Sequence, residues 1–206
     1  MLAGRKKLFN LCTIPGTNFV IRRSLLEKIG GWDVKALAED TEISFRTYIM
    51  GYHINFQPAA VTWEQEPQTF VVWFRQRTRW VKGNIYVILK NLKLLFNPKS
   101  KAIRFDLIYF LSIYFLLSVS GLVHTSIYGF SNWLWFFAVI LFVLGTFITI
   151  TTEKGEMTLQ NLLIIVLMYL VYSQMWLIVA FYGMIMYVQE QIFHKKAKWY
   201  KTQRYE

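Results

Sequence analysis

Two adjacent carboxylates, Glu39 and Asp40, stand at the start of a predicted helix and are well suited to acid–base chemistry. Apolar side chains recur with helical spacing over 41–50, and Gly51 follows them as a stop signal. The exposed N–H groups of a first helical turn stabilise a carboxylate as the anion. Asp40 could then accept a proton from a substrate hydroxyl as a general base. The alternative, that Asp40 only caps the helix, stays open on the residues alone.

Gln76, Arg79 and Trp80 form a second group with chemical potential. They fall at positions i, i+3 and i+4 and therefore share one face of a predicted helix. An amide, a guanidinium and an indole on one face could grip a diphosphate through charge-assisted hydrogen bonds and stack a sugar ring. The competing interpretation is a basic, aromatic helix that anchors the chain to a membrane.

Alternating helices and strands are expected around these residues. We predict helices at 24–29 and 41–50, and short strands at 19–21, 54–56 and 60–63. This part of the chain is too short to build a doubly wound sheet alone. It is therefore interpreted as a piece of a larger α/β domain.

The remainder of the chain is strongly apolar. Hydrophobic residues make up 55% of the sequence, and two stretches, Leu107 to Thr152 and Met157 to Gln189, contain no Asp, Glu, Lys or Arg. A helix of about 20 apolar residues crosses a hydrocarbon core. Three membrane spans are predicted, at Leu107–Gly129, Trp133–Thr151 and Leu162–Val188. The third is overlong, so the alternative that part of it lies in the interface or is broken stays open.

A basic amphipathic helix is predicted to connect the polar and apolar parts. Residues 69–96 have helical spacing with a break or kink near Gly83, and Lys82, Lys90 and Lys93 punctuate the apolar positions. Such a helix suits the bilayer interface. We favour this over a surface helix of a soluble core because a charge-free stretch follows closely.

The formal net charge is +11, which raises the question of nucleic-acid binding. The basic residues flank the predicted spans, as on the cytoplasmic side of membrane proteins, and no nucleic-acid-binding module occurs among them. No nucleic-acid partner is expected. The single cysteine, Cys12, excludes an intrachain disulfide and a thiolate zinc cluster.

Four motifs occur in a fixed order ahead of the apolar stretches. They are Gly16-Thr17-Asn18 with Arg22-Arg23 behind it, Gly30-Gly31-Trp32-Asp33, Ala38-Glu39-Asp40, and Gln76-x-x-Arg79-Trp80. This order resembles the C-terminal half of processive family 2 glycosyltransferases, which include cellulose, hyaluronan and poly-N-acetylglucosamine synthases. The motifs cover residues 8–105, and the resemblance beyond them is one of architecture.

The resemblance implies an inverting transfer of sugar from a UDP-sugar to a growing β-linked polysaccharide. Asp40 would be the catalytic base that deprotonates the acceptor hydroxyl. The residues implied to bind the donor diphosphate, the acceptor terminus or the loop beside it are Glu39, Gln76, Arg79, Trp80, Gly16 and Thr17. A non-catalytic membrane partner or export element derived from such an enzyme is the alternative function.

The sequence differs from the family motifs at several positions. Ala38 replaces the Thr of the base motif, and Pro15 stands where cellulose synthases have Cys, which argues against cellulose. The sequence contains no Asp-x-Asp, so ligands for the Mg²⁺ or Mn²⁺ of the intact enzyme are missing, and nothing matches the uridine-binding Asp. We expect the nucleotide-binding half to be absent and the chain alone to be inactive. A truncated gene model and a split gene product, in which a separate N-terminal half or accessory subunit supplies the missing half, are both left open.

The predicted architecture has three parts. Residues 1–82 would form an α/β fragment, the C-terminal part of a GT-A-type catalytic domain. Residues 83–105 would form the interfacial amphipathic helix, and 106–206 an α-helical membrane region of about three spans with a basic tail. The expected location is the plasma membrane, multi-pass, with the lipid bilayer as a partner and the catalytic part in the cytoplasm.

Overall fold

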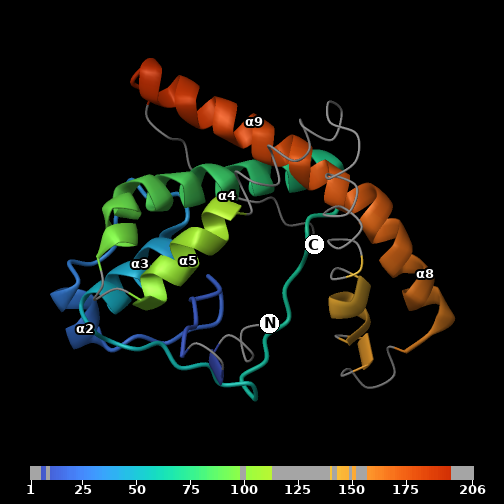
Figure 1. Ribbon diagram of the computed structural model, residues 1–206, viewed down its shortest axis with the longest axis horizontal. Helices are drawn as coiled ribbons and strands as arrows, with labels where there is room; N and C mark the ends of the chain where they lie inside the picture. Colours follow the sequence, from blue (N-terminus) through green and yellow to red (C-terminus); the bar gives the residue numbers. More distant parts are fainter. Residues whose placement is uncertain are drawn as a thin grey trace. The chain divides into compact units, whose positions relative to one another are not determined.

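The computed structural model describes residues 6–7, 10–97, 101–112, 140, 143–148, 150–151 and 157–195. The chain divides into two compact units, Met1–Ser112 with Tyr182–Glu206, and Ile113–Phe181. Within the described ranges both units consist of helices, turns and extended segments, with no β-strand (Figure 1).

The first unit holds most of the described helices. Its elements are α2 (Arg23–Lys28), α3 (Glu39–Ile49), α4 (Phe70–Asn91), the 3₁₀ helix η1 (Leu92–Phe96), α5 (Lys101–Leu111) and the last part of α9 (Ser173–Ile192). The second unit contains α8 (Leu159–Leu167), the π-helical η3 (Met168–Tyr172) and the beginning of α9.

The expected strands at 19–21, 54–56 and 60–63 are not formed among the described residues. A strand exists only where its N–H and C=O groups bond to a neighbouring strand, and no described segment offers that pairing. Phe19 and Ile54 instead pack against a cluster that includes Ile14, Ile29 and Ile43. The apolar pattern therefore indicated partial burial at 19–21 and 54–56 but not strand pairing, whereas Val61 and Trp63 are exposed. The α/β class stays a prediction.

The predicted helices are confirmed in position. Residues 24–29 and 41–50 correspond to α2 and α3, and Thr69 caps α4 by accepting a hydrogen bond from the Val72 N–H. The break expected near Gly83 is wrong, because α4 runs through this residue without interruption.

Gly83 has a packing role instead. A Cβ atom at this position would lie 2.5 Å from the backbone nitrogen of Ala38 and 2.9 Å from the carbonyl carbon of Leu37. The glycine therefore lets α4 touch the backbone that leads into α3, with no side chain between them. This contact fixes the distance between the helix of Arg79 and the first turn of α3.

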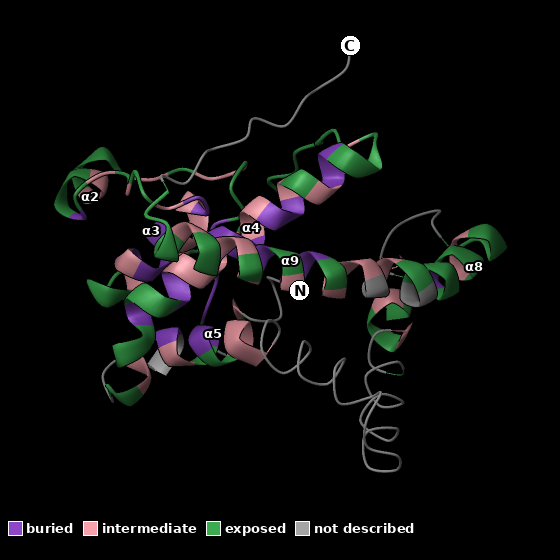
Figure 2. Cartoon of the chain, turned by 90° about the horizontal axis from the view of Figure 1, so that it is seen from above, coloured by how far each residue is buried: buried purple, intermediate pink, exposed green. Residues whose placement is uncertain are grey.

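Helices α3, α4 and α5 contact one another and bury the core of the first unit (Figures 1 and 2). Phe45 of α3, Val87 of α4 and Leu107 of α5 are all at most 2% exposed. Their burial in three different helices provides the hydrophobic stabilisation of this unit.

The last part of α9 lies against α4. A Cβ atom on Gly183 would stand 2.6 Å from Cγ1 of Val81, so the two helices approach closely. The rings of Phe74 and Tyr182 are 5.2 Å apart between centroids. Lys82 forms an ion pair with Glu190, and both side chains are largely buried.

One described segment, Met175–Ile192, is long and apolar enough to cross a membrane, judged by length and composition alone. The predicted span Leu162–Val188 corresponds to α8, η3 and most of α9. The spans predicted at Leu107–Gly129 and Trp133–Thr151 lie mostly outside the described residues. The number of spans and the predicted domain boundaries stay predictions.

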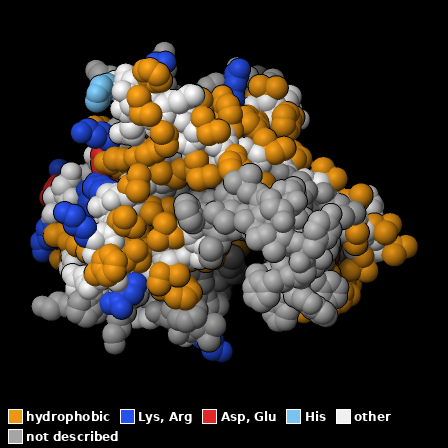
Figure 3. All heavy atoms as spheres, turned by 45° about the horizontal axis from the view of Figure 1, so that its top comes forward, with side chains coloured by type: hydrophobic (Ala, Val, Ile, Leu, Met, Phe, Trp, Pro, Cys, Tyr) orange, Lys and Arg blue, Asp and Glu red, His pale blue; other side chains and the backbone are white. Residues whose placement is uncertain are grey.

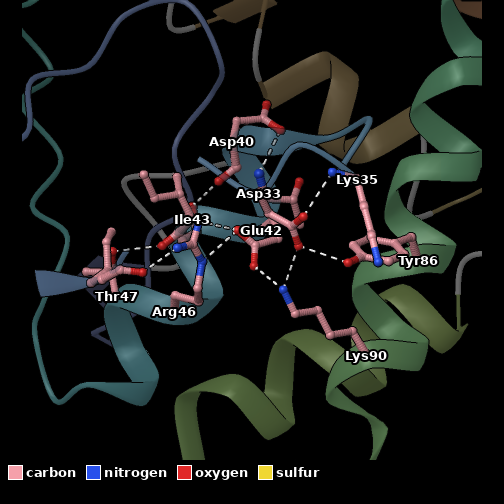
Figure 4. Close-up of polar contacts among 12 residues, drawn as sticks. Asp33, Lys35, Asp40, Glu42, Ile43, Arg46, Thr47, Tyr86 and Lys90 are labelled. Atoms are coloured by element: carbon pink, nitrogen blue, oxygen red, sulfur yellow. Dashed lines mark hydrogen bonds and ion pairs between the residues drawn. The ribbon is translucent and has the colours of Figure 1, made fainter. Parts of the chain in front are cut away.

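A polar network around the buried Glu42 and the exposed Lys90 joins α3, α4 and the loop before α3 (Figure 4). The Lys90 ammonium donates to Asp33 Oδ2 and to Glu42 Oε1, each at 2.7 Å. Tyr86 donates to the same Asp33 oxygen at 2.9 Å, and Arg46 donates to Glu42 Oε2 at 2.7 Å. Lys82 and Lys90 are thus bound to protein carboxylates, a role that the amphipathic pattern did not predict.

Burial acts to raise the pKa of Asp33, but hydrogen bonds from Lys90, the Lys35 N–H and Tyr86, together with the Lys90 charge, lower it to about 2. The folded state therefore holds Asp33 as an anion. The anion is stabilising above the ordinary pKa of 3.8, and this contribution disappears as the pH falls toward 2.

We predict that Gly83→Ala destabilises the first unit. The new Cβ would press on the Ala38 backbone, and overpacking of this kind costs about 1–3 kcal/mol. Thermal unfolding in detergent, followed by circular dichroism, measures the effect. Gly145→Ala is the matched control. Residues 143–148 are helical, a Cβ at 145 meets nothing within 4 Å, and alanine stabilises a helix by up to about 1 kcal/mol relative to glycine. Equal midpoints for the two variants would contradict the close contact.

We also predict that Asp33→Asn removes a pH dependence of stability between pH 3.8 and about 2. The wild-type chain should lose on the order of 1 kcal/mol in this window, allowing for solvent screening, because protonation ends the attraction to Lys90. Denaturant unfolding at a series of pH values gives the slope. Glu27→Gln, a carboxylate-to-amide change on exposed α2, should leave the slope unchanged. An unchanged slope in Asp33→Asn would show that another group titrates.

Candidate active site

Asp40 is the second residue of α3 rather than its cap. The N-cap residue is Ala38, which makes no side-chain cap hydrogen bond. Oδ1 of Asp40 accepts a hydrogen bond of 2.7 Å from the Thr41 N–H, and the Asp40 carbonyl accepts one of 2.7 Å from the Ser44 hydroxyl. The carboxylate is therefore held in the first turn of α3, while the N-cap position is filled by a residue without a capping group.

Gly16 makes room for the second carboxylate oxygen. Its φ is +91°, a conformation that favours glycine, and a Cβ there would stand 2.8 Å from Asp40 Oδ2. The preceding segment is tied to α3 because the Ile14 N–H donates to Ser44 Oγ at 2.9 Å. The Gly16 loop, which the resemblance implies to lie beside the acceptor, thus lies next to Asp40.

Arg79 reaches the same region from α4. Its Nη1 donates to the Leu37 carbonyl at 2.8 Å. Burial lowers the pKa of the guanidinium, while the charges of Glu39 and Asp40 raise it. Arg79, Glu39 and Asp40 therefore form a half-buried group of one cation and two carboxylates at the junction of α3 and α4.

Burial raises the pKa of Asp40 above its ordinary value of 3.8, and the nearby Glu39 charge acts in the same direction, while the Thr41 N–H opposes it. From the sequence alone, the N–H groups of the first turn are expected to favour the anion. Desolvation outweighs them, because the carboxylate is withdrawn from water between Gly16 and α3. A raised pKa makes this carboxylate a stronger base than an exposed aspartate.

Thr17 and the segment before α4 form one border of the site. The Thr17 hydroxyl donates a hydrogen bond to Glu64. Two residues further on, Glu66 accepts a hydrogen bond of 3.1 Å from Nη2 of Arg77. The extended segment that precedes α4 is thereby held to both the Gly16 loop and the helix.

Gln76 and Trp80 lie on α4 with Arg79, as predicted, and both are half-buried. The Arg77 guanidinium carbon lies 4.0 Å from the centroid of the Trp80 ring, a cation–π contact. Direct contacts of Gln76 and Trp80 with Asp40 stay a prediction.

Three contributors to this site were not predicted from the sequence. The Leu37 carbonyl positions Arg79, Ser44 anchors the Asp40 backbone, and Arg77 braces Trp80. Arg77 could have been found, since it precedes Trp80 by three residues on a helix. The Leu37 carbonyl carried no signal, because any residue type supplies a backbone oxygen.

The described residues do not fit a divalent cation. No group of three His, Cys, Asp or Glu side chains within these ranges could hold one. Asp33 and Glu42, which approach each other through Lys90, are both occupied by its ammonium group.

Comparison with known proteins decides the family. The chain matches the family described as glycosyl transferase family group 2 over residues 3–189. The chain belongs to this family. It is 49% identical over 215 aligned residues to the probable glycosyltransferase YdaM of Bacillus subtilis, covering 98% of this chain and 51% of that protein. No solved structure was found to match.

A second group of relatives resembles a shorter part of the chain. The poly-beta-1,6-N-acetyl-D-glucosamine synthases of Staphylococcus aureus and Staphylococcus epidermidis are each 32% identical over 79 residues. The aligned part is 38% of this chain and 19% of each synthase. The chain spans about half the length of the Bacillus relative.

Proposed function

We propose that this chain carries the catalytic base and part of the substrate-binding surface of a membrane-bound glycosyltransferase. The reaction is transfer of a sugar from a UDP-sugar to a growing β-linked polysaccharide, with inversion at the anomeric carbon. The observation that carries the proposal is the half-buried Asp40, seated against Gly16 and beside Arg79. Membership of the family supports the reaction class.

Asp40 acts as the general base. It takes the proton of the acceptor hydroxyl while that oxygen forms a bond to the anomeric carbon and the bond from this carbon to the UDP oxygen breaks. The pKa of Asp40, raised by burial, suits a group that must hold this proton through the transition state. The N–H of Thr41 keeps one carboxylate oxygen fixed, so the other, beside Gly16, receives the proton.

Arg79 has the role of binding the donor diphosphate. A guanidinium presents five N–H donors, of which the Leu37 carbonyl uses one in the structure. The others offer charge-assisted hydrogen bonds to phosphate oxygens as negative charge develops on the leaving UDP. Trp80, braced by Arg77, provides the aromatic surface for the sugar at the acceptor terminus.

N-acetylglucosamine is the sugar we favour, because the staphylococcal relatives are named as synthases of its β-1,6-linked polymer. The nucleotide-binding part of such an enzyme would lie in the half of the Bacillus relative that this chain does not cover. The catalytic part would face the cytoplasm at the plasma membrane, with α9 in the bilayer.

The proposal is tested by fusing the chain to the N-terminal portion of the Bacillus relative and assaying membranes with UDP-N-acetylglucosamine. We expect radiolabelled polymer from the fusion and none from the chain alone. Failure of the fusion to transfer sugar from this or any other UDP-sugar, despite correct membrane insertion, would favour the non-catalytic partner.

Within that fusion, Asp40→Asn should lower the transfer rate by about 10²–10⁴-fold, since the amide cannot accept the proton. Nucleotide-sugar affinity should stay within a few-fold, because the amide is nearly isosteric. The acid limb of the wild-type pH–rate profile should lie above pH 3.8, in the direction of the raised pKa. Glu27→Gln is the matched control on exposed α2 and should leave the rate unchanged.

Arg79→Lys provides the contrast, because the loss of bidentate geometry should weaken donor binding as well as turnover. Near-native rates in Asp40→Asn would show that another group is the base.

A further inference from the structure

A groove of about 350 Å³ lies between α4 and the last part of α9 and reaches Arg79. Its basic lining consists of Arg75, Arg79 and Lys82, all from α4. No acidic or amide side chain is among the described residues that line it. Glu190 pairs with Lys82, and Glu39 and Asp40 lie near Arg79. None of these carboxylates lines the groove, so its lining presents cationic and not anionic side chains.

The polar side chains that line the groove are mostly hydrogen-bond donors, so they suit a ligand that accepts hydrogen bonds. Arginine and lysine only donate, and the absence of carboxylates and amides from the lining leaves hydroxyls as the sole side-chain acceptors. A saccharide needs acceptors for its own hydroxyl protons, whereas a phosphate group needs donors only. The lining therefore favours an anion over a sugar.

Thr78 supplies a second, independent indication. The residue lines the groove and is 8% exposed, and its hydroxyl has no hydrogen-bond partner within the described part of the chain. A buried hydroxyl is normally hydrogen-bonded, because burying it unpaired costs free energy. Thr78 lies one helical turn from Arg75 and from Lys82. A phosphate oxygen bound there would accept a hydrogen bond from the Thr78 hydroxyl.

The remainder of the groove is apolar and continues onto an exposed apolar surface. Phe70 and Val71 of the lining are 60% and 55% exposed. On α9, Ile185 and Ile192 are 54% and 65% exposed, within the segment long and apolar enough to cross a membrane. Figure 3 shows hydrophobic side chains gathered on the face that this view brings forward. Exposed apolar surface of this kind marks a site of contact with lipid or with another protein.

We propose that the groove between α4 and α9 binds one anionic phospholipid of the bilayer. Its phosphate lies among Arg75, Thr78 and Lys82, and its acyl chains lie over Phe70 and along α9. Free phosphate would leave the apolar surface uncovered, so the lipid is the occupant that satisfies both halves of the lining. Because the groove also reaches Arg79, the lipid would link the bilayer to the helix that carries this residue. The lipid site stands independently of the proposed reaction.

The site is tested by native mass spectrometry of the full chain in detergent. The chain is titrated with phosphatidylglycerol and, in parallel, with phosphatidylcholine of the same acyl chains. We expect phosphatidylglycerol to be retained about fivefold more tightly for each basic residue that contacts its phosphate. Equal retention of the two lipids would overturn the proposal.

Variants then locate the lipid. Arg75→Gln should lower retention of phosphatidylglycerol about fivefold, whereas Arg23→Gln, the same charge change on an exposed side chain of α2, should have no effect. Thr78→Val should weaken phosphatidylglycerol binding with little effect on thermal stability, because the wild-type hydroxyl is already unpaired. An equal loss in Arg23→Gln would show non-specific attraction and would overturn the site.

Competition experiments distinguish the lipid from two other ligands of the groove, inorganic phosphate and a saccharide. Displacement of phosphatidylglycerol by millimolar inorganic phosphate would show that the headgroup alone is bound. Displacement by an N-acetylglucosamine oligomer would assign the groove to the saccharide. Either result overturns the lipid site, and retention of the lipid against both supports it.

Discussion

Helix α4 touches the backbone in front of α3 with no side chain between them, because residue 83 is a glycine. The rest of the first unit depends on this approach. It brings Arg79 within hydrogen-bond distance of the Leu37 carbonyl and places its charge beside Glu39 and Asp40. A larger residue at position 83 would move the cation away from the carboxylates, since the rigid helix transmits a displacement along its length. The geometry of the candidate site therefore depends on the contact between the backbone of α4 at Gly83 and the backbone of residues 37–38.

The Lys90 network holds the same two helices together from the other end of α4. Glu42 is 1% exposed and would be costly to bury as an anion without partners. Lys90 and Arg46 satisfy it, and Lys90 also binds Asp33 in the loop before α3. Lys90, which the sequence places in an amphipathic pattern, is thus bound to two carboxylates of its own unit. Its charge is used inside the unit, to orient the helix whose first turn carries Asp40.

Burial shifts the pKa values of Asp40 and Arg79 in opposite directions. Burial raises the pKa of Asp40 and lowers that of Arg79, so withdrawal from water favours the neutral form of each. The carboxylates beside Arg79 counteract this effect on the guanidinium, which retains its cation. A base of increased proton affinity next to a retained cation is the combination that transfer to a hydroxyl acceptor from a diphosphate donor requires. This agreement, together with the family match, supports the proposed glycosyl transfer.

The sequence by itself determined the helices around the motifs and the candidate residues, because helical periodicity and the types of the motif residues are local properties. It also indicated the family, which the comparisons established. Only the tertiary structure decided how these parts meet. The strands expected at 19–21 and 54–56 are not paired among the described residues, since pairing depends on neighbours that local pattern does not specify. Gly83 was taken for a break, although its absent Cβ serves a distant backbone. The raised pKa of Asp40 likewise follows from burial between segments far apart in the sequence, a property that no local motif encodes.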